Sequence, residues 1–409
     1  MLRGVALLWA GSLTTAACTL ATQIFLARQV TPMEFGAFST AITIASILAV
    51  CTNMGISQFW MSFYAKAGNQ SNSWNKAIIR LTGTNFALLF IATLLISKFT
   101  TQNTSLTTLL LILSPHILGQ AAVEIVSARY QSTYEYKKVF LTMATPHVAR
   151  LIAITALYFI SSGVADINDY ALTYAVTAIS AYSILVIKLS KAHTKTKKSK
   201  TRSIAQLLRR SWPFGVVILL NQIYFQGNII IAGTTVSLEN AGNYAIATSI
   251  MSAIYMFPSI FYQKFMLPKL YHLRLKSPEK LESIYKQHIT VMLTLGSACT
   301  VITFILASWA VGIIFGEKYS HAAAILSTLS LAAPFQFMSS AASSNLISHK
   351  ESKIKIKILA TITAANFSVS YAAGTFYGID AIAWVAVCSA IILQIAYSQA
   401  IRAVKNEKA

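Results

Sequence analysis

KLSKAHTKTKKSKTRSIAQLLRR, residues 188–210, decides how this chain is organised, because it is strongly basic and separates two long apolar regions. Nine of its 23 residues are lysine or arginine, and none is acidic. Such a segment is typical of a cytoplasmic loop that joins two membrane-embedded halves. The alternative, a nucleic-acid-binding patch, lacks a soluble domain to carry it. We therefore expect no nucleic-acid partner.

The composition also indicates a membrane protein. The chain has 409 residues, of which 55% are hydrophobic and 11% are charged, whereas soluble domains carry about 25% charged residues. The formal net charge of +21 is expected from basic cytoplasmic loops. The four cysteines are far apart in apolar stretches, and no metal-binding spacing occurs, so neither a disulfide framework nor a metal or other cofactor is expected.

Apolar stretches of about 20 residues predict twelve membrane-spanning helices. The N-terminal stretch is too long for a cleaved signal peptide, so we interpret it as the first of them. The predicted helices of the first half are 7–27, 36–56, 78–97, 106–127, 139–161 and 169–188. Those of the second half are 212–232, 242–263, 289–311, 322–344, 357–377 and 381–401.

Charge predicts the orientation of these helices. With twelve spans, both termini and every second loop lie on one side, which holds most of the 33 lysines and arginines. The opposite loops hold only Arg28, Lys98 and Lys318. Basic loops stay in the cytoplasm, so both termini are expected there. The outer loops are short, which disfavours an enzyme such as a membrane polysaccharide polymerase.

A short internal repeat relates the two halves. VTPMEFGAFSTA (30–41) aligns without gaps on VSLENAGNYAIA (236–247), at an offset of 206 residues, and both follow the first helix of a half. Six helices per half give a parallel repeat, an arrangement used by alternating-access transporters with a site between the halves. We therefore predict an all-α integral membrane protein with a central cavity. Its predicted parts are a six-helix half (1–190), a basic connector (191–210) and a second six-helix half (211–409).

Two motifs carry a resemblance to a known family. LARQVTPMEFGAF (26–38) is similar to the signature that follows the first helix of polysaccharide-unit (O-antigen, Wzx-type) flippases. These belong to the multidrug/oligosaccharidyl-lipid/polysaccharide exporter superfamily. GNYAIA (242–247), which leads to Phe257-Pro258 and Leu267-Pro268, looks like its counterpart after the seventh helix.

The resemblance implies a MATE-like fold and a flippase. Its substrate would be an undecaprenyl-pyrophosphate-linked oligosaccharide, such as an O-antigen or capsular repeat unit, moved from the inner to the outer leaflet of the bacterial inner membrane. Membrane lipids and other polysaccharide-assembly proteins, including those of lipopolysaccharide biosynthesis, would be further partners. Coupling to an ion is left open.

Arg150 is the most informative single residue, because it lies near the centre of the fifth predicted helix. An arginine there costs about 2.5–3.5 kcal/mol on insertion scales and usually faces the bundle interior. It suits an anionic ligand such as a pyrophosphate, or else a polar group on a neighbouring helix. His147 lies one turn away on the same face and His116 at similar depth on the fourth helix. Both follow prolines that can break the helices locally, and either histidine could take up a proton or pack structurally.

Glu124 and Arg28 are weaker candidates. Glu124 is an ion-coupling candidate near the inner end of the fourth helix, although an ion pair with Arg80 or Arg129 is the alternative. Arg28 at the outer end of the first helix could receive the phosphate or extend to lipid headgroups.

Polar stripes mark the leading helix of each half. They could hydrogen-bond sugar hydroxyls in a seam between the halves, or hold helices together. Their members are Thr15, Thr19 and Gln23 on the first helix, and Gln222, Gln226 and Asn228 on the seventh.

Charge distinguishes the flippase from its main alternative. A multidrug cation antiporter of the same superfamily would be expected to place acids inside the bundle, where this sequence offers only Glu124 against Arg150. The membrane polymerase is the third and least favoured function.

Overall fold

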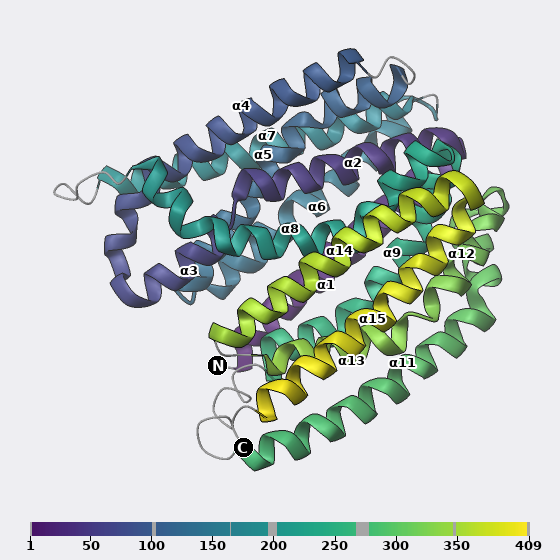
Figure 1. The fold of residues 1–409 in the computed structure, drawn as a ribbon. Helices are drawn as coiled ribbons and strands as arrows, with labels where there is room; N and C mark the ends of the chain where they lie inside the picture. The colour runs from purple at the N-terminus through teal and green to yellow at the C-terminus, as the bar shows by residue number, and fades with distance from the viewer. Residues whose placement is uncertain are drawn as a thin grey trace. The chain divides into compact units, whose positions relative to one another are not determined.

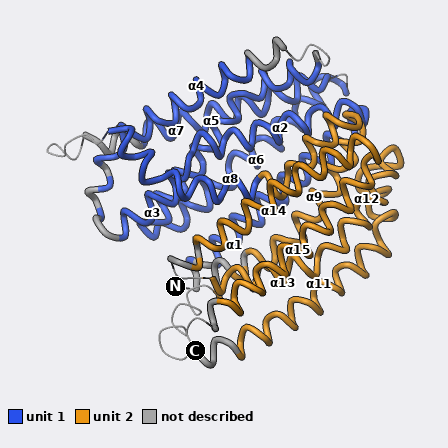
Figure 2. The backbone as a smooth tube through the Cα atoms, viewed as in Figure 1, with its two compact units in different colours: residues 1–222 blue, residues 223–409 orange. Residues whose placement is uncertain are grey.

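The computed structural model of the chain is helical, and the residues it describes contain no β-strand (Figure 1). The chain folds into two compact units, Met1–Gln222 (unit 1) and Ile223–Ala409 (unit 2), and each is described by itself (Figure 2). The described residues are 2–99, 104–163, 165–194, 203–266, 278–346 and 349–406. Leu267-Pro268 and residues 195–202 of the predicted connector lie outside these ranges.

Unit 1 begins with seven α-helices and a 3-10 segment, and it ends within an eighth α-helix. The elements are α1 (Leu2–Gln29), α2 (Pro32–Asn53), α3 (Ile56–Ala67), η1 (Gly68–Trp74), α4 (Asn75–Phe99), α5 (Thr104–Ser132), α6 (Tyr136–Ile160), α7 (Ile167–Thr194) and α8 (Ile204–Thr235). The division between the units falls inside α8. The predicted boundaries at residues 190 and 210 stay a prediction.

Unit 2 contains the rest of α8 and the C-terminal helices. These are α9 (Leu238–Ile260), the π-helical η2 (Phe261–Met266), α11 (Pro278–Phe315), η3 (Glu317–Tyr319), α12 (Ser320–Ser330), α13 (Ala333–Asn345), α14 (His349–Tyr377) and α15 (Ile379–Asn406).

Each of the twelve predicted spans coincides with a helix or a pair of consecutive helices. Among the described residues, ten helices are long and apolar enough to cross a membrane. The η3–α12 and α13 segments pass the same test together, with a bend of 48° between them. The helix α9, the predicted eighth span, is not among the ten. The chain is therefore an all-α, multi-pass membrane protein, as its hydropathy predicts.

In unit 1, α5 packs against both α7 and α2, while α1 packs against α6. The approach of α5 to α7 is especially close at Gly119, where an added Cβ would lie 2.5 Å from the Cα of Ala178. A glycine is needed there because any side chain would separate the two helices. Such small-residue packing is the usual way in which membrane helices approach each other.

The internal repeat has a structural basis in helix capping. Thr31 caps α2, because its hydroxyl accepts from the Glu34 backbone N–H at 3.3 Å and the Glu34 carboxylate accepts from the Thr31 N–H at 2.8 Å. Ser237, at the same offset of 206 residues, caps α9 and accepts from the Asn240 N–H at 3.1 Å. The two repeat segments therefore start their helices at equivalent positions.

A short break separates α2 from α3. Met54 and Gly55 both have positive φ, 46° and 74°, which ends α2 in a left-handed cap. The following α3 buries Ile56, Phe59 and Trp60. These residues extend the helical layer of unit 1 beyond the predicted second span, which ends at residue 56.

Candidate functional site

The interior of unit 1 holds a buried arginine. Arg150 is 6% exposed and lies on the same face of α6 as the buried Val139 and Ile154. Its guanidinium therefore faces other helices of the unit rather than the surrounding lipid. This is the orientation expected for a cation that cannot be left in hydrocarbon.

Tyr174 of α7 supports this cation. The guanidinium carbon of Arg150 lies 3.9 Å from the centroid of the Tyr174 ring. The same ring meets His116 of α5 edge to face, with centroids 5.8 Å apart, and Phe38 of α2 with centroids 5.1 Å apart. A desolvated cation–π contact contributes about 2 kcal/mol or more, which offsets part of the cost of burying the guanidinium.

No acidic side chain neutralises Arg150 in the described part of the chain. The ion pairs among those residues join Lys138 to Glu135 and His321 to Asp380. The buried Nε of Arg150 and Nδ1 of His116 have no hydrogen-bond partner within the described ranges. Because buried polar atoms are normally hydrogen-bonded, this cluster is chemically suited to an anionic ligand.

His147 extends the cluster towards α1. Its Nδ1 lies 3.0 Å from the hydroxyl oxygen of Thr19, and the Thr15 hydroxyl donates to the Met143 carbonyl at 3.3 Å. Of the predicted site residues, the structure thus brings Arg150, His116, His147, Thr15 and Thr19 together on three helices of unit 1. Here the two threonines join α1 to α6, as the helix-packing interpretation predicts.

The expected local breaks at Pro115 and Pro146 are not observed. Both prolines lie inside continuous helices, α5 and α6. Neighbouring helices can re-satisfy the backbone carbonyl that a proline leaves free, so the adjacent histidines are held on regular helical turns.

Glu124 lies apart from this cluster, next to the break between α2 and α3. Its carboxylate accepts a hydrogen bond from the Asn53 amide, and Asn53 also donates to the Ser57 hydroxyl at 3.0 Å. Glu124 forms no ion pair with a described residue. The expected pairing with Arg80 or Arg129 is therefore replaced by an amide contact. A half-buried carboxyl with a neutral partner suits a proton or a small cation.

The remaining predicted residues are dispersed. Arg28 is exposed at the end of α1, and Gln23 is half-buried on the same helix. On α8, Gln222 belongs to unit 1, while Gln226 and Asn228 belong to unit 2. Asn228 is 3% exposed; it donates to the Tyr244 hydroxyl at 3.2 Å and accepts from Asn366 at 3.3 Å.

Unit 2 contains a cavity of about 60 Å³ that adjoins Asn228. This volume has room for a few water molecules. Its polar lining includes Tyr224, Asn228, Tyr244, Tyr255, Gln336 and Ser389. The Ser389 hydroxyl donates to that of Tyr224 at 3.5 Å. The described residues include no group of three or more histidines, cysteines or acids that could hold a metal ion.

Sequence reasoning missed Tyr174 and Asn53. Both are neutral polar residues in apolar helices, where tyrosine and asparagine are common and hydropathy gives no signal. Their importance appears only through the charged partner that each contacts, Arg150 and Glu124.

A family model described as "Polysaccharide biosynthesis protein" matches residues 1–273. Among solved structures, the lipid II flippase MurJ in an inward closed conformation is similar over 96% of this chain and 86% of that chain, with a TM-score of 0.74 and 16% identity. An inward-facing multidrug resistance MATE transporter of the MOP superfamily has a TM-score of 0.75 and 12% identity, over 96% and 95%. A eukaryotic MATE transporter, AtDTX14, has a TM-score of 0.65 and 13% identity, over 98% and 96%.

No curated protein matches the chain. At these low identities the solved structures establish a shared fold. They confirm the predicted MATE-like architecture.

Proposed function

The chain belongs to the polysaccharide biosynthesis protein family, and on that premise we propose that it is a flippase for an anionic lipid-linked oligosaccharide. The substrate would be an undecaprenyl-pyrophosphate-linked O-antigen or capsular repeat unit, moved from the inner to the outer leaflet of the bacterial inner membrane. Both termini would lie in the cytoplasm. The proposed step transfers the substrate without a chemical reaction, and it uses no cofactor.

One observation carries this proposal, the buried guanidinium of Arg150. The described residues provide it with an aromatic ring but with no carboxylate. Arginine binds phosphate through a planar fork of N–H donors, and a pyrophosphate would supply the missing negative charge. This charge balance also favours an anionic substrate over the cationic drugs of a multidrug antiporter.

The other candidate residues would have supporting roles. His116 and His147 would add donors near the phosphate, and Glu124 would hold the coupling proton or cation. Arg28 would meet the phosphate as it leaves. Hydrogen bonds to sugar hydroxyls would come from Thr15, Thr19, Gln23, Gln222, Gln226 and Asn228. The halves 1–190 and 211–409 would alternate in access about the connector 191–210.

The proposal is tested by replacing Arg150. We expect Arg150→Ala to lower the transfer of lipid-linked glycan to the outer leaflet at least about 100-fold, because a charged hydrogen-bonded contact is worth roughly 3 kcal/mol. Arg150→Lys keeps the charge but loses the fork, so an intermediate rate is expected. Membrane abundance of each variant must equal that of the original protein. An Arg150→Ala protein that transfers glycan at the original rate would rule out this role.

The proposed orientation has its own test. A reporter enzyme that works only in the cytoplasm should be active when it is fused after Lys200, and a reporter that works only in the periplasm should be inactive there. Periplasmic activity would reverse the orientation of every helix.

A further inference from the structure

Four basic side chains at one end of unit 1 lie over aromatic rings, and each of the four comes from a different helix. We call this group the basic aromatic cluster. The guanidinium carbon of Arg129 lies 5.5 Å from the centroid of the Trp60 ring, and that of Arg210 lies 5.7 Å from the centroid of the Trp74 ring. The ammonium nitrogens of Lys138 and Lys188 lie 5.4 Å and 4.6 Å from the centroid of the Tyr130 ring.

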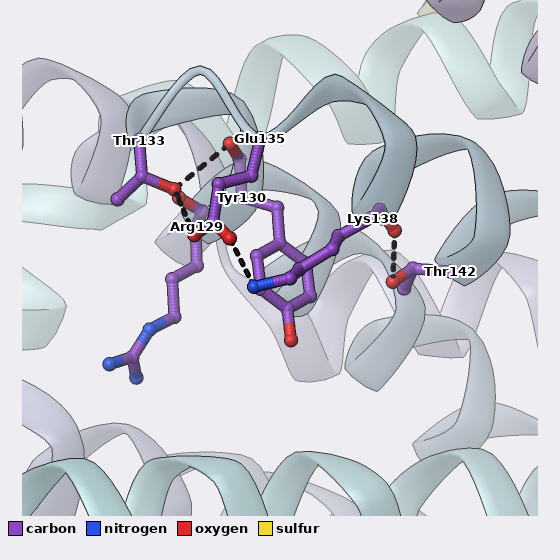
Figure 3. Close-up of polar contacts among 6 residues, drawn as sticks. All are labelled: Arg129, Tyr130, Thr133, Glu135, Lys138 and Thr142. Atoms are coloured by element: carbon purple, nitrogen blue, oxygen red, sulfur yellow. Dashed lines mark hydrogen bonds and ion pairs between the residues drawn. The ribbon is translucent and has the colours of Figure 1, made fainter.

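The three rings belong to one hydrophobic core. Trp60 and Trp74 are 2% and 1% exposed, and they pack in the same cluster as Tyr130. Rings that are fixed in a core hold the cations at defined positions. Figure 3 shows the ammonium group of Lys138 beside the Tyr130 ring, close to the Glu135 carboxylate at the turn between α5 and α6.

The cluster lies where membrane spans end. Arg129 is in the last turn of the Ser105–Ser132 span, Lys138 is in the first turn of Tyr136–Ile160, and Lys188 ends Ile167–Lys188. Arg210 lies near the start of the Ile204–Thr235 span. Tryptophan, tyrosine and basic residues gather at this depth, where lipid headgroups meet the hydrocarbon.

Apolar side chains are exposed beside these cations. Ile184 lies one turn before Lys188 on α7 and is 47% exposed; Leu141 lies one turn after Lys138 on α6 and is 57% exposed. The two helices are in contact. A basic end followed by an exposed apolar face matches the two parts of a phospholipid, the headgroup and the acyl chains.

The positive charge of the cluster exceeds its negative charge. Glu135 forms an ion pair with Lys138, whereas Lys188 and Arg210 form no ion pair with any residue of the described ranges. A cation that sits over a ring keeps N–H groups available for another acceptor. Anionic phosphate oxygens are therefore the complementary ligand.

We propose that the basic aromatic cluster is a binding site for an anionic glycerophospholipid. Its phosphate would lie between Lys188 and Arg210, and its acyl chains would lie along α6 and α7. This site is separate from the buried Arg150 cluster, and its existence does not depend on the glycan substrate.

The test compares phospholipids of different charge on the full-length protein. Purified protein is titrated with phosphatidylglycerol or phosphatidylcholine, and binding is followed by native mass spectrometry and by the rise in Tm. We expect Lys188→Gln with Arg210→Gln to weaken phosphatidylglycerol binding about thirtyfold, since each basic residue near a membrane surface contributes about 1 kcal/mol.

Two further variants serve as controls. Lys353→Gln with Lys357→Gln removes the same charge from α14, where neither lysine lies over a ring in the described structure, and should bind phosphatidylglycerol normally. Lys188→Arg with Arg210→Lys keeps both charges and should retain binding. It also shows that the positions tolerate substitution, which is checked by gel filtration and by Tm without lipid.

Three results would overturn the proposal. In the first, phosphatidylcholine binds as tightly as phosphatidylglycerol. In the second, the α14 control loses as much affinity as the variant of the cluster. In the third, undecaprenyl pyrophosphate displaces phosphatidylglycerol from the cluster at a lower concentration than phosphatidylglycerol itself requires, which would assign the site to the transported substrate.

Discussion

The guanidinium carbon of Arg150 and the ring of Tyr174 are 3.9 Å apart, although the two residues lie on different helices, α6 and α7. The ring lies against the guanidinium and brings no negative charge to it. An aromatic residue thus stabilises the buried charge without neutralising it. A carboxylate in the same place would have competed with an anionic ligand.

The aromatic ring of Tyr174, rather than its hydroxyl, should therefore be what glycan transfer requires. We expect Tyr174→Phe to transfer glycan within about threefold of the original rate, whereas Tyr174→Leu loses the cation–π contact and slows transfer at least about tenfold. The measurement is the appearance of lipid-linked glycan in the outer leaflet at equal protein abundance. Equal activity of the two variants would show that the ring has no such role.

Variants of Asn53 and Glu124 should distinguish a loss of folding stability from a loss of ion coupling. Asn53→Leu leaves the Glu124 carboxyl without its partner, so the free energy of unfolding should fall by about 1–3 kcal/mol. Glu124→Gln can still accept from Asn53 and should unfold like the original protein. If Glu124 holds the coupling ion, its variant loses the dependence of transfer on pH or sodium. Chemical unfolding of both variants, and glycan transfer across imposed proton or sodium gradients, test the pair.

Glu135 should make stability depend on pH. Hydrogen bonds from Lys138 and Thr133 hold its pKa below the ordinary value of 4.5. The ion pair therefore stabilises the folded state above that value, and the stabilisation is lost as pH falls through the lowered pKa. Because the pair is at the surface, water and salt screen it and the effect is small.

Glu135→Gln isolates this contribution. The variant should have a lower Tm than the original protein at neutral pH, and the difference should vanish as the pH falls through the lowered pKa of Glu135. A difference that is constant across this range would exclude the carboxylate as its source. Tm is measured in one detergent throughout.

Thr31→Ala should destabilise unit 1 by about 1 kcal/mol, because it removes the capping box of α2. Thr31→Ser retains the hydroxyl and is the control. The same pair of outcomes is expected for Ser237→Ala and Ser237→Thr at the start of α9. Chemical unfolding measures both. Equal stability of the alanine and hydroxyl variants would mean that the repeat segments do not owe their resemblance to capping.

Hydropathy predicts the spans well because the hydrocarbon core sets their length. It misses helices that continue past a predicted span, and it misses contacts that depend on neutral residues. The segment from Ile56 to Trp74 follows the predicted second span, yet it forms α3 and η1 and contributes Trp60 and Trp74 to the core. Arg150 could be predicted because its charge is conspicuous in an apolar helix. Tyr174 could not, because only three-dimensional packing relates it to Arg150.

The close approach of Gly119 to Ala178 has a consequence for motion. Interlocked at this point, α5 and α7 form one stiff body, and that body carries both His116 and Tyr174. We therefore expect these two rings to keep their spacing when other helices of unit 1 move. A shift that loads or releases a ligand near Arg150 is then expected to involve α6 and α1, which pack against each other, rather than a separation of α5 from α7.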